Sequence, residues 1–192
     1  MKPPKNWGAT AQERARRYPC DGLEFEADDT YFRAIDVAAA PALLFRWLCQ
    51  LRVAPYSYDA IDNFGRRSPR RLTPGLEALV PGQRMMTIFR LAAFAAPSSL
   101  TIVLASRVAA AVMGDFCGTY DVRARAAGSR LVAKIRVRYP RGPYGRLLRR
   151  ALPYLDLFMF RKQLLTLQRY AERDGRASRD NSLPPAHVVR DV

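Results

Sequence analysis

The stretch that decides the fold is "GTYDVRARAAGSRLVAKIRVRY", residues 118–139. Apolar residues alternate with mostly charged ones along both halves of this stretch. The apolar positions are Tyr120, Val122 and Ala124, followed by Leu131, Ala133, Ile135, Val137 and Tyr139. A period of two in adjacent runs, joined by a turn at Ala127 and Gly128, predicts an antiparallel hairpin with one dry and one solvated face.

Segments typical of strands and a short helix lie before this hairpin. Residues 30–37, "TYFRAIDV", are rich in β-branched and aromatic side chains, which favours a first strand. Pro41 then marks a helix start, where its missing N–H costs least. The inward face of that helix is predicted from helical spacing and comprises Leu44, Trp47, Leu48 and Leu51. We further predict strands at 84–91 and 99–108, with a turn at 95–98 between them.

The longest helical pattern occupies residues 142–175. Its apolar stripe consists of Leu157, Phe160, Leu164, Leu167 and Ala171, widened by Phe158 and Leu165. Pro153 either starts this helix or kinks a longer one, and Gly175 is a natural stop. The order of strand, short helix, antiparallel strands and long terminal helix predicts the α+β class.

Composition and charge limit the classes of protein that fit. The 192 residues suit a single domain, which we place at 23–175, with flexible tails at 1–22 and 176–192. Lys and Arg number 32 against 17 Asp and Glu, and only four of the 32 are Lys. This field attracts anions without identifying one. Three widely spaced cysteines, no N-terminal apolar run and no 20-residue apolar segment predict a cytoplasmic protein.

Four segments in this order resemble a known superfamily. They are "YFRAIDVAAAPALLFRWLCQL", "YSYDAIDNFGRRSPRRLTPGLEALVPGQ", the "GSRL" turn at 128–131 and "RKQLLTLQRYAE" near the C-terminus. Together they are similar to the SRPBCC or START-like proteins, which include the birch-pollen-allergen type, and within them to the bacterial polyketide cyclase/dehydratase-like branch. The resemblance implies a helix-grip fold, in which a curved antiparallel sheet wraps around the long C-terminal helix and encloses an apolar cavity.

The function that this resemblance implies is binding of a hydrophobic or amphipathic small molecule, lipid-like or polyketide-like, as a carrier, sensor or accessory protein. We expect the cavity lining to include Tyr56 and Tyr58 near the mouth, with Phe89, Ile102, Leu104, Tyr120, Val122, Ile135, Val137, Leu157, Phe160 and Leu164 inside. The alternative is a cyclase, aromatase or dehydratase that uses cavity Tyr, Asp or Arg side chains. Oligomeric state and ligand identity are not encoded in any pattern that we recognise.

The segment "YSYDAIDNFGRRS", residues 56–68, is the densest polar cluster. Asp59 and Asp62 are spaced to share a helical face, where paired carboxylates act in acid/base chemistry or hold a cation. The competing interpretation, which we favour, is that they cap a turn or pair with the arginines at 66–71. Asn63 and Arg90 complete the possible polar site. Strand parity leaves the direction of Arg90 and Arg107 open, with Arg90 outside the barrel as the better prediction.

Other chemistries have little support in the sequence. The only histidine is His187, close to the C-terminus, and no CxxC or glycine-rich phosphate loop occurs. We therefore predict no metal site and no cofactor, and no catalytic residue is assigned. The arginine-rich segments at 66–71 and 141–150 leave a second alternative, a basic surface that contacts nucleic acid or an anionic membrane, although no specific nucleic-acid motif is present.

Overall fold

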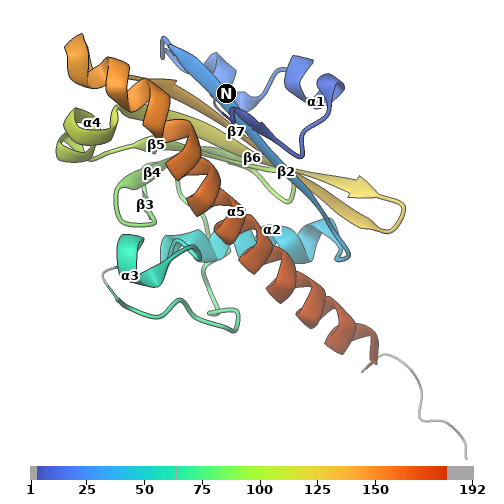
Figure 1. The fold of residues 1–192 in the computed structure, drawn as a ribbon. Coiled ribbons are helices and arrows are strands. Elements are labelled where there is room, and N and C mark those ends of the chain that lie inside the picture. The colour runs from blue at the N-terminus through green and yellow to red at the C-terminus, as the bar shows by residue number, and fades with distance from the viewer. Residues whose placement is uncertain (1–3, 64, 181–192) are drawn as a thin grey trace, which may run out of the picture.

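A seven-stranded sheet and one long helix dominate the computed structural model, which describes residues 4–63 and 65–180 (Figure 1). Over these ranges the strand order is β1-β2-β7-β6-β5-β4-β3, and every neighbouring pair is antiparallel except β1 and β2. The strands are β1 (Asn6–Trp7), β2 (Asp29–Val37), β3 (Arg84–Met85), β4 (Phe89–Ala95), β5 (Ser99–Leu104), β6 (Asp115–Arg125) and β7 (Gly128–Arg138). In the described part of the chain, no helix has both the length and the apolar character to span a membrane.

The predicted hairpin is confirmed as β6 and β7, the two longest strands of the sheet. Tyr120 is opposite Ala133 and Val122 is opposite Leu131, so the apolar alternation of the two strands falls on one face. Gly128 closes the turn with φ of 140°, and a Cβ on it would lie 2.2 Å from the Val37 carbonyl oxygen. The turn therefore requires glycine for both backbone conformation and space.

The helices are α1 (Ala11–Ala15), η1 (Pro19–Gly22), α2 (Pro41–Cys49), η2 (Gln50–Arg52), α3 (Asp59–Asp62), α4 (Arg107–Met113) and α5 (Gly142–Asp180). Helix α5 crosses the apolar face of the sheet and packs on β2 and α2 (Figure 1). The α+β class and the helix-grip arrangement predicted from the sequence are both confirmed.

Helix α2 closes one end of the core. Pro41 occupies its first turn, as predicted, and its inward residues Leu44, Trp47 and Leu48 are fully buried together with Leu51 of η2. They join the apolar face of the sheet and the second half of α5 in one continuous core. Burial of each such side chain contributes roughly 1.5–3 kcal/mol, so these residues stabilise the attachment of α2 to the sheet and to α5.

Two of the predicted strands differ from the structure. The strand expected at 84–91 is interrupted, because Met86 adopts a φ of 50° and its N–H donates to the Leu51 carbonyl instead of to a strand. The strand expected at 99–108 ends at residue 104. Ser106 then caps helix α4, its hydroxyl accepting a hydrogen bond from the Ala109 N–H. The run "RVAAAVM" has a helix-forming composition and carries its own cap signal.

Helix α5 also exceeds its predicted end. It continues through Gly175 to Asp180, and Pro153 lies inside it, since the helix starts at Gly142. Gly175 lies against Leu43 and Ala39 near α2, and a Cβ on it would meet them at ordinary contact distances of 3.5 and 3.6 Å, so the glycine ends neither the helix nor its packing. The predicted tail at 176–192 is therefore helical as far as 180, and its remainder lies outside the described residues.

The predicted N-terminal tail is wrong for residues 4–22, which form a docked arm on the outer face of the sheet. Strand β1 pairs with β2, and α1 begins with a capping box between Thr10 and Glu13. Glu13 accepts hydrogen bonds from Arg130 on β7 at 2.8 and 3.0 Å. Beneath the arm lies a second apolar cluster made of Ala9, Tyr18, Cys20, Phe32, Ala34, Cys117 and Val132. The face expected to be solvated is thus partly covered.

The Glu13–Arg130 pair predicts how stability changes with acid. The hydrogen bond from Arg130 holds the pKa of Glu13 at about 2, below its ordinary 4.5. Because the folded pKa is lowered, the pair stabilises the protein above pH 4.5 and loses that contribution as pH falls toward 2. We expect the stability gap between wild type and Glu13→Gln to narrow by about 2 kcal/mol from about pH 5 to about pH 3.

Urea denaturation at each pH measures this gap. Glu24→Gln is the matched control, because Glu24 is an exposed carboxylate that follows the arm by two residues. Its curve is expected to run parallel to that of the wild type. A gap for Glu13→Gln that stays constant with pH would show that the pair does not set the acid response.

Candidate functional site

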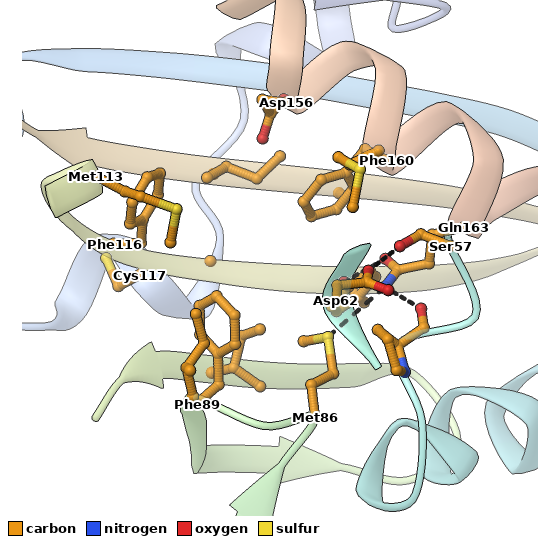
Figure 2. Close-up of a pocket in the computed structure, with 18 of the residues that line it drawn as sticks. Ser57, Asp62, Met86, Phe89, Met113, Phe116, Cys117, Asp156, Phe160 and Gln163 are labelled. Carbon is orange, nitrogen blue, oxygen red and sulfur yellow. Dashed lines mark hydrogen bonds between the residues drawn. The ribbon is translucent and has the colours of Figure 1, made fainter. Parts of the chain in front are cut away.

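A cavity of about 370 Å³ lies between the apolar face of the sheet and the first half of α5 (Figure 2). Residues from α3, α4, the 86–88 turn and four strands complete its walls. Its apolar lining includes Ile61, Met86, Ile88, Phe89, Ile102, Met113, Phe116, Tyr120, Ala133, Ile135, Leu152, Leu155, Met159 and Phe160. Its size lies at the lower end of the ~300–1,000 Å³ typical of small-molecule sites.

Helix α5 contributes one face to the cavity, set by helical spacing. Leu152, Asp156, Met159 and Gln163 recur at intervals of three and four residues and so project on the same side. Phe160 adds a ring that stacks on Tyr120 of β6, with 5.9 Å between centroids. The apolar stripe predicted from the sequence lies on the neighbouring face of the helix. Its members Leu164, Leu167 and Ala171 pack into the core and do not line the cavity.

The mouth of the cavity is marked by lining residues that are also open to solvent. Ile61 of α3 is 62% exposed and Leu155 of α5 is 51% exposed. Beside them, the Tyr58 ring stacks on Phe158 of α5 at a centroid distance of 4.3 Å and an angle of 5°. The exposed lining residue Thr87 belongs to the 86–88 turn, so the entrance runs between α3, this turn and α5 and has a mainly apolar rim.

One polar group of the cavity is a relay between β6, α5 and the segment before α3. The Tyr120 hydroxyl donates to Gln163 Oε1 at 2.6 Å, and Gln163 Nε2 donates to the Pro55 carbonyl at 2.7 Å (Figure 2). Burial raises the pKa of Tyr120, so its hydroxyl stays protonated and donates the hydrogen bond to Gln163. The relay fixes the side chains of both residues and leaves their hydrogen bonds satisfied within the protein.

A second polar group is Asp62, which ends α3 at the cavity wall. Its Oδ2 accepts a hydrogen bond from the Ser57 hydroxyl (Figure 2). Its Oδ1 is buried and has no hydrogen-bond partner in the structure. Burial raises the pKa of this carboxyl, and the bond from Ser57 opposes that rise. Asp62 also forms no ion pair with any described residue. Its Oδ1 is therefore a hydrogen-bond acceptor without a partner beside the apolar space.

The third polar group is an ion pair at the base of the cavity. Arg33 of β2 is 0% exposed, and its Nε and Nη2 donate to Asp156 Oδ2 at 3.0 and 2.6 Å. Its Nη1 donates to the Phe32 carbonyl at 2.9 Å. Burial raises the pKa of Asp156 to about 6, against the opposing effect of Arg33. The pair joins β2 to α5 and places a carboxylate at the edge of the apolar space.

The cavity contains some of the residues that the sequence predicts there. Five predicted side chains line it: Phe89, Ile102, Tyr120, Ile135 and Phe160. The others do not. Leu104 and Leu157 are half-buried elsewhere, whereas Val122, Val137 and Leu164 belong to the core, and Tyr56 is buried between Trp47 and Tyr170.

The predicted polar site is divided by the structure. Asp59 accepts hydrogen bonds from the backbone N–H and hydroxyl of Ser68, and Asn63 donates to the Arg66 carbonyl. Both lie away from the cavity, and Arg90 is exposed, as strand parity favoured. In the described part of the chain neither Asp59 nor Asp62 pairs with an arginine, so the ion-pair half of that expectation is wrong, whereas Asp59 does cap a backbone N–H of the following loop.

Asp156 and Arg33 escaped prediction, although the sequence holds a signal for them. Asp156 interrupts the apolar run "ALPYLDLFMF", and Arg33 interrupts the shorter run "TYFRAI". A single charge inside each of two apolar runs suggests that the two charges neutralise one another. Met86 and Met113 were missed because they lie on an irregular turn and on the unpredicted helix α4.

The chain resembles known proteins in its fold and not in its sequence. No protein-family model matches the sequence, and no curated protein matches it either. Among solved structures, a protein from Mesorhizobium loti matches with 15% identity and a TM-score of 0.47, over 76% of this chain and 98% of that chain. The AHSA1-like protein from Aeromonas hydrophila matches with 13% identity and a TM-score of 0.44, over 77% and 94%.

The di-domain ARO/CYC StfQ from the steffimycin biosynthetic pathway matches with 14% identity and a TM-score of 0.45, over 78% of this chain and 51% of that chain. These likenesses concern the course of the backbone and leave the activity of this chain undetermined. The sheet, the long helix and the cavity between them define a protein of the helix-grip class, as the sequence resemblance implies.

The buried ion pair predicts a strong difference between single and double substitutions. Asp156→Leu is expected to destabilise the protein by about 3–5 kcal/mol, because it leaves the Arg33 charge buried without a partner. Arg33→Met combined with Asp156→Leu removes both charges and is expected to recover most of that loss. Urea denaturation gives both values. A double variant no more stable than Asp156→Leu would show that the loss of stability does not come from an unpaired Arg33 and would contradict this prediction.

Proposed function

We propose that this protein binds an apolar small molecule with a hydrogen-bond donor at one end, as a carrier or sensor. The observation that supports the proposal is the cavity of about 370 Å³ between α5 and the sheet, whose lining is almost entirely apolar. An apolar space of this size in a folded protein is lined by side chains that gain contacts when a matching molecule enters.

The polar groups of the cavity suggest the chemistry of the ligand. The relay through Tyr120 and Gln163 is complete without a ligand, and Arg33 already neutralises Asp156. Asp62 is different, because its buried Oδ1 has no partner in the structure. A ligand hydroxyl that donates to Oδ1 satisfies this oxygen. The mouth between Ile61 and Leu155 would bring the polar end of such a molecule close to α3.

A catalytic role is a second candidate, and one observation favours it. Asp62 combines a raised pKa with a position on the cavity wall, which is the environment of a general acid or base. In a cyclase, aromatase or dehydratase, Asp62 would move the proton and the apolar walls would fold the substrate. The residues to substitute are then Asp62 and Tyr120, since Tyr58 and Asp59 lie outside the cavity.

Filling the cavity tests whether it is the binding site. Met159→Trp adds volume at a half-buried lining position of α5, whereas Tyr154→Trp places the same side chain on an exposed position of the same helix. We expect Met159→Trp to weaken binding of the neutral dye Nile red at least about tenfold, because the space that the dye enters is lost. Tyr154→Trp is expected to bind as wild type does.

Fluorescence titration measures the dye affinity, and thermal melting confirms that each variant is folded. Native mass spectrometry of the purified wild type adds a search for a co-purified ligand. Equal dye affinity in the two tryptophan variants would reject the cavity as the site of binding.

The unpaired oxygen of Asp62 predicts a preference between two matched ligands. 2-Naphthol differs from naphthalene by one hydroxyl, and a hydrogen bond to a charged group contributes about 1.5–3 kcal/mol. We expect wild type to favour 2-naphthol at least about tenfold beyond the preference shown by Asp62→Leu. Displacement of Nile red measures both affinities. An unchanged preference in the variant would assign the hydroxyl to another partner and contradict the role given to Asp62.

A further inference from the structure

A second concave surface lies beside the cavity, between the loop after α3 and the second half of α5. We call it the basic groove, and its volume is about 970 Å³. It is lined by Tyr56, Ser57, Asp59, Arg67, Ser68, Arg70, Lys162, Leu165, Thr166, Arg169, Tyr170, Arg173 and Arg176. Figure 1 shows the two elements that form it, the loop following α3 and the later turns of α5. Ser57 is shared with the cavity, but the two lining sets are otherwise different.

The charge of the groove is strongly one-sided. Six of its lining residues are cations, and the acidic one among those described, Asp59, has its carboxylate engaged by Ser68. Arg173 is held in place, because it pairs with Asp174 at 2.7 Å and donates to the Arg70 carbonyl at 2.7 Å. The other five cations form no ion pair with any residue that the structure describes: Arg67, Arg70, Lys162, Arg169 and Arg176.

This concentration sets the groove apart from the basic surface of β6 and β7. On those strands arginines and lysines are matched by acids, as in the pairs Arg130–Glu13, Lys134–Asp21 and Arg138–Asp115. In the groove the positive charges face one concave space and are not paired with acidic side chains there, apart from Arg173. A concave surface of one sign focuses the field and raises the local concentration of anions.

A buried hydroxyl provides a second, independent observation. Tyr56 lines the groove, is only 1% exposed, and its hydroxyl has no hydrogen-bond partner in the structure. Its ring is fixed by edge contacts with Trp47 and Tyr170, at centroid distances of 5.9 and 6.2 Å. A buried donor without a partner is uncommon in folded proteins, and this one belongs to a residue of the groove, where an acceptor oxygen of a ligand would satisfy it.

We propose that the basic groove binds a small molecule that carries two or more phosphate groups. Guanidinium groups match phosphate oxygens in a planar, bidentate geometry, and four of the five unpaired cations of the groove are arginines. Several cations around one space favour an anion with several charges close together over a single carboxylate. The bounded volume suits a small molecule, whereas a nucleic-acid strand extends over a longer surface. This site is separate from the apolar cavity, and it stands whether or not the cavity binds a ligand.

Trp47 supplies an optical probe of the groove. Arg173 lies over its ring at 6.0 Å and Tyr170 lies 5.0 Å from it, so an anion that draws on Arg173 alters the surroundings of the indole. The other tryptophan, Trp7, is replaced by Phe in all proteins compared, which leaves the emission of Trp47 alone. Inorganic pyrophosphate is the ligand titrated, with inorganic phosphate as the singly phosphorylated comparison.

We expect saturable binding of pyrophosphate that is tighter than that of phosphate and weakens as salt rises. The variant Arg70→Gln with Arg169→Gln is expected to lose at least about tenfold in affinity, since two phosphate contacts disappear. The matched control is Arg146→Gln with Arg150→Gln, which removes two exposed arginines of α5 outside the groove. It is expected to change affinity less than about twofold.

Three results would overturn the proposal. The first is equal weakening in the groove variant and in its control, which would indicate attraction by total charge. The second is a titration without saturation. The third is a single-stranded oligonucleotide that binds more tightly than pyrophosphate, is not displaced by it, and is weakened alike by both double variants, which would assign the basic surface to nucleic acid.

Discussion

The buried pair of Arg33 and Asp156 is the interaction on which the rest of the structure depends. It joins the strand next to the sheet edge to the middle of α5, through two hydrogen bonds to one carboxylate oxygen. Two charges in the interior persist only when each stays beside the other, so the helix is held at one position along β2. On α5 the pair lies within the stretch from Leu152 to Gln163 that lines the cavity, and the core residues Leu164, Leu167 and Ala171 follow it on the same helix. The pair therefore holds the helix in place at the level of the space for a ligand.

Local periodicity explains which parts of the fold the sequence reveals. The hairpin, strand β2 and helix α2 are each specified by alternation or by helical spacing, and all three lie where those patterns place them. The N-terminal arm has no period of its own. It is held by contacts with partners more than ninety positions away, such as Cys20 with Thr119 and Glu13 with Arg130. Pairs this far apart in the sequence cannot be recognised from the pattern of neighbouring residues. The local pattern of the arm therefore predicts a tail.

The candidate site was only partly predictable for a similar reason. Strand parity identified Phe89, Ile102, Tyr120 and Ile135, because a residue on the inner face of a curved sheet has few other places to point. On α5 the predicted stripe is the widest apolar one, and only its member Phe160 lines the cavity, whereas Leu164, Leu167 and Ala171 belong to the core. The cavity face is narrower and includes Asp156 and Gln163, which a search for apolar residues passes over. The polar members of a ligand site are recognisable only once their partners are known.

The two edge strands of the sheet affect how copies of this protein can associate with one another. One edge is closed by β1 and the other by β3, and each of these strands is two residues long. A strand of two residues presents too few free N–H and C=O groups for a second chain to extend the sheet. The long strands β6 and β7, which have the composition of a strong template for intermolecular pairing, are interior, and the arm pairs with the outer edge of β2 at Phe32 and Arg33. The docked arm thus interrupts the free edge of β2, which opposes edge-to-edge pairing, a task separate from the binding of any ligand.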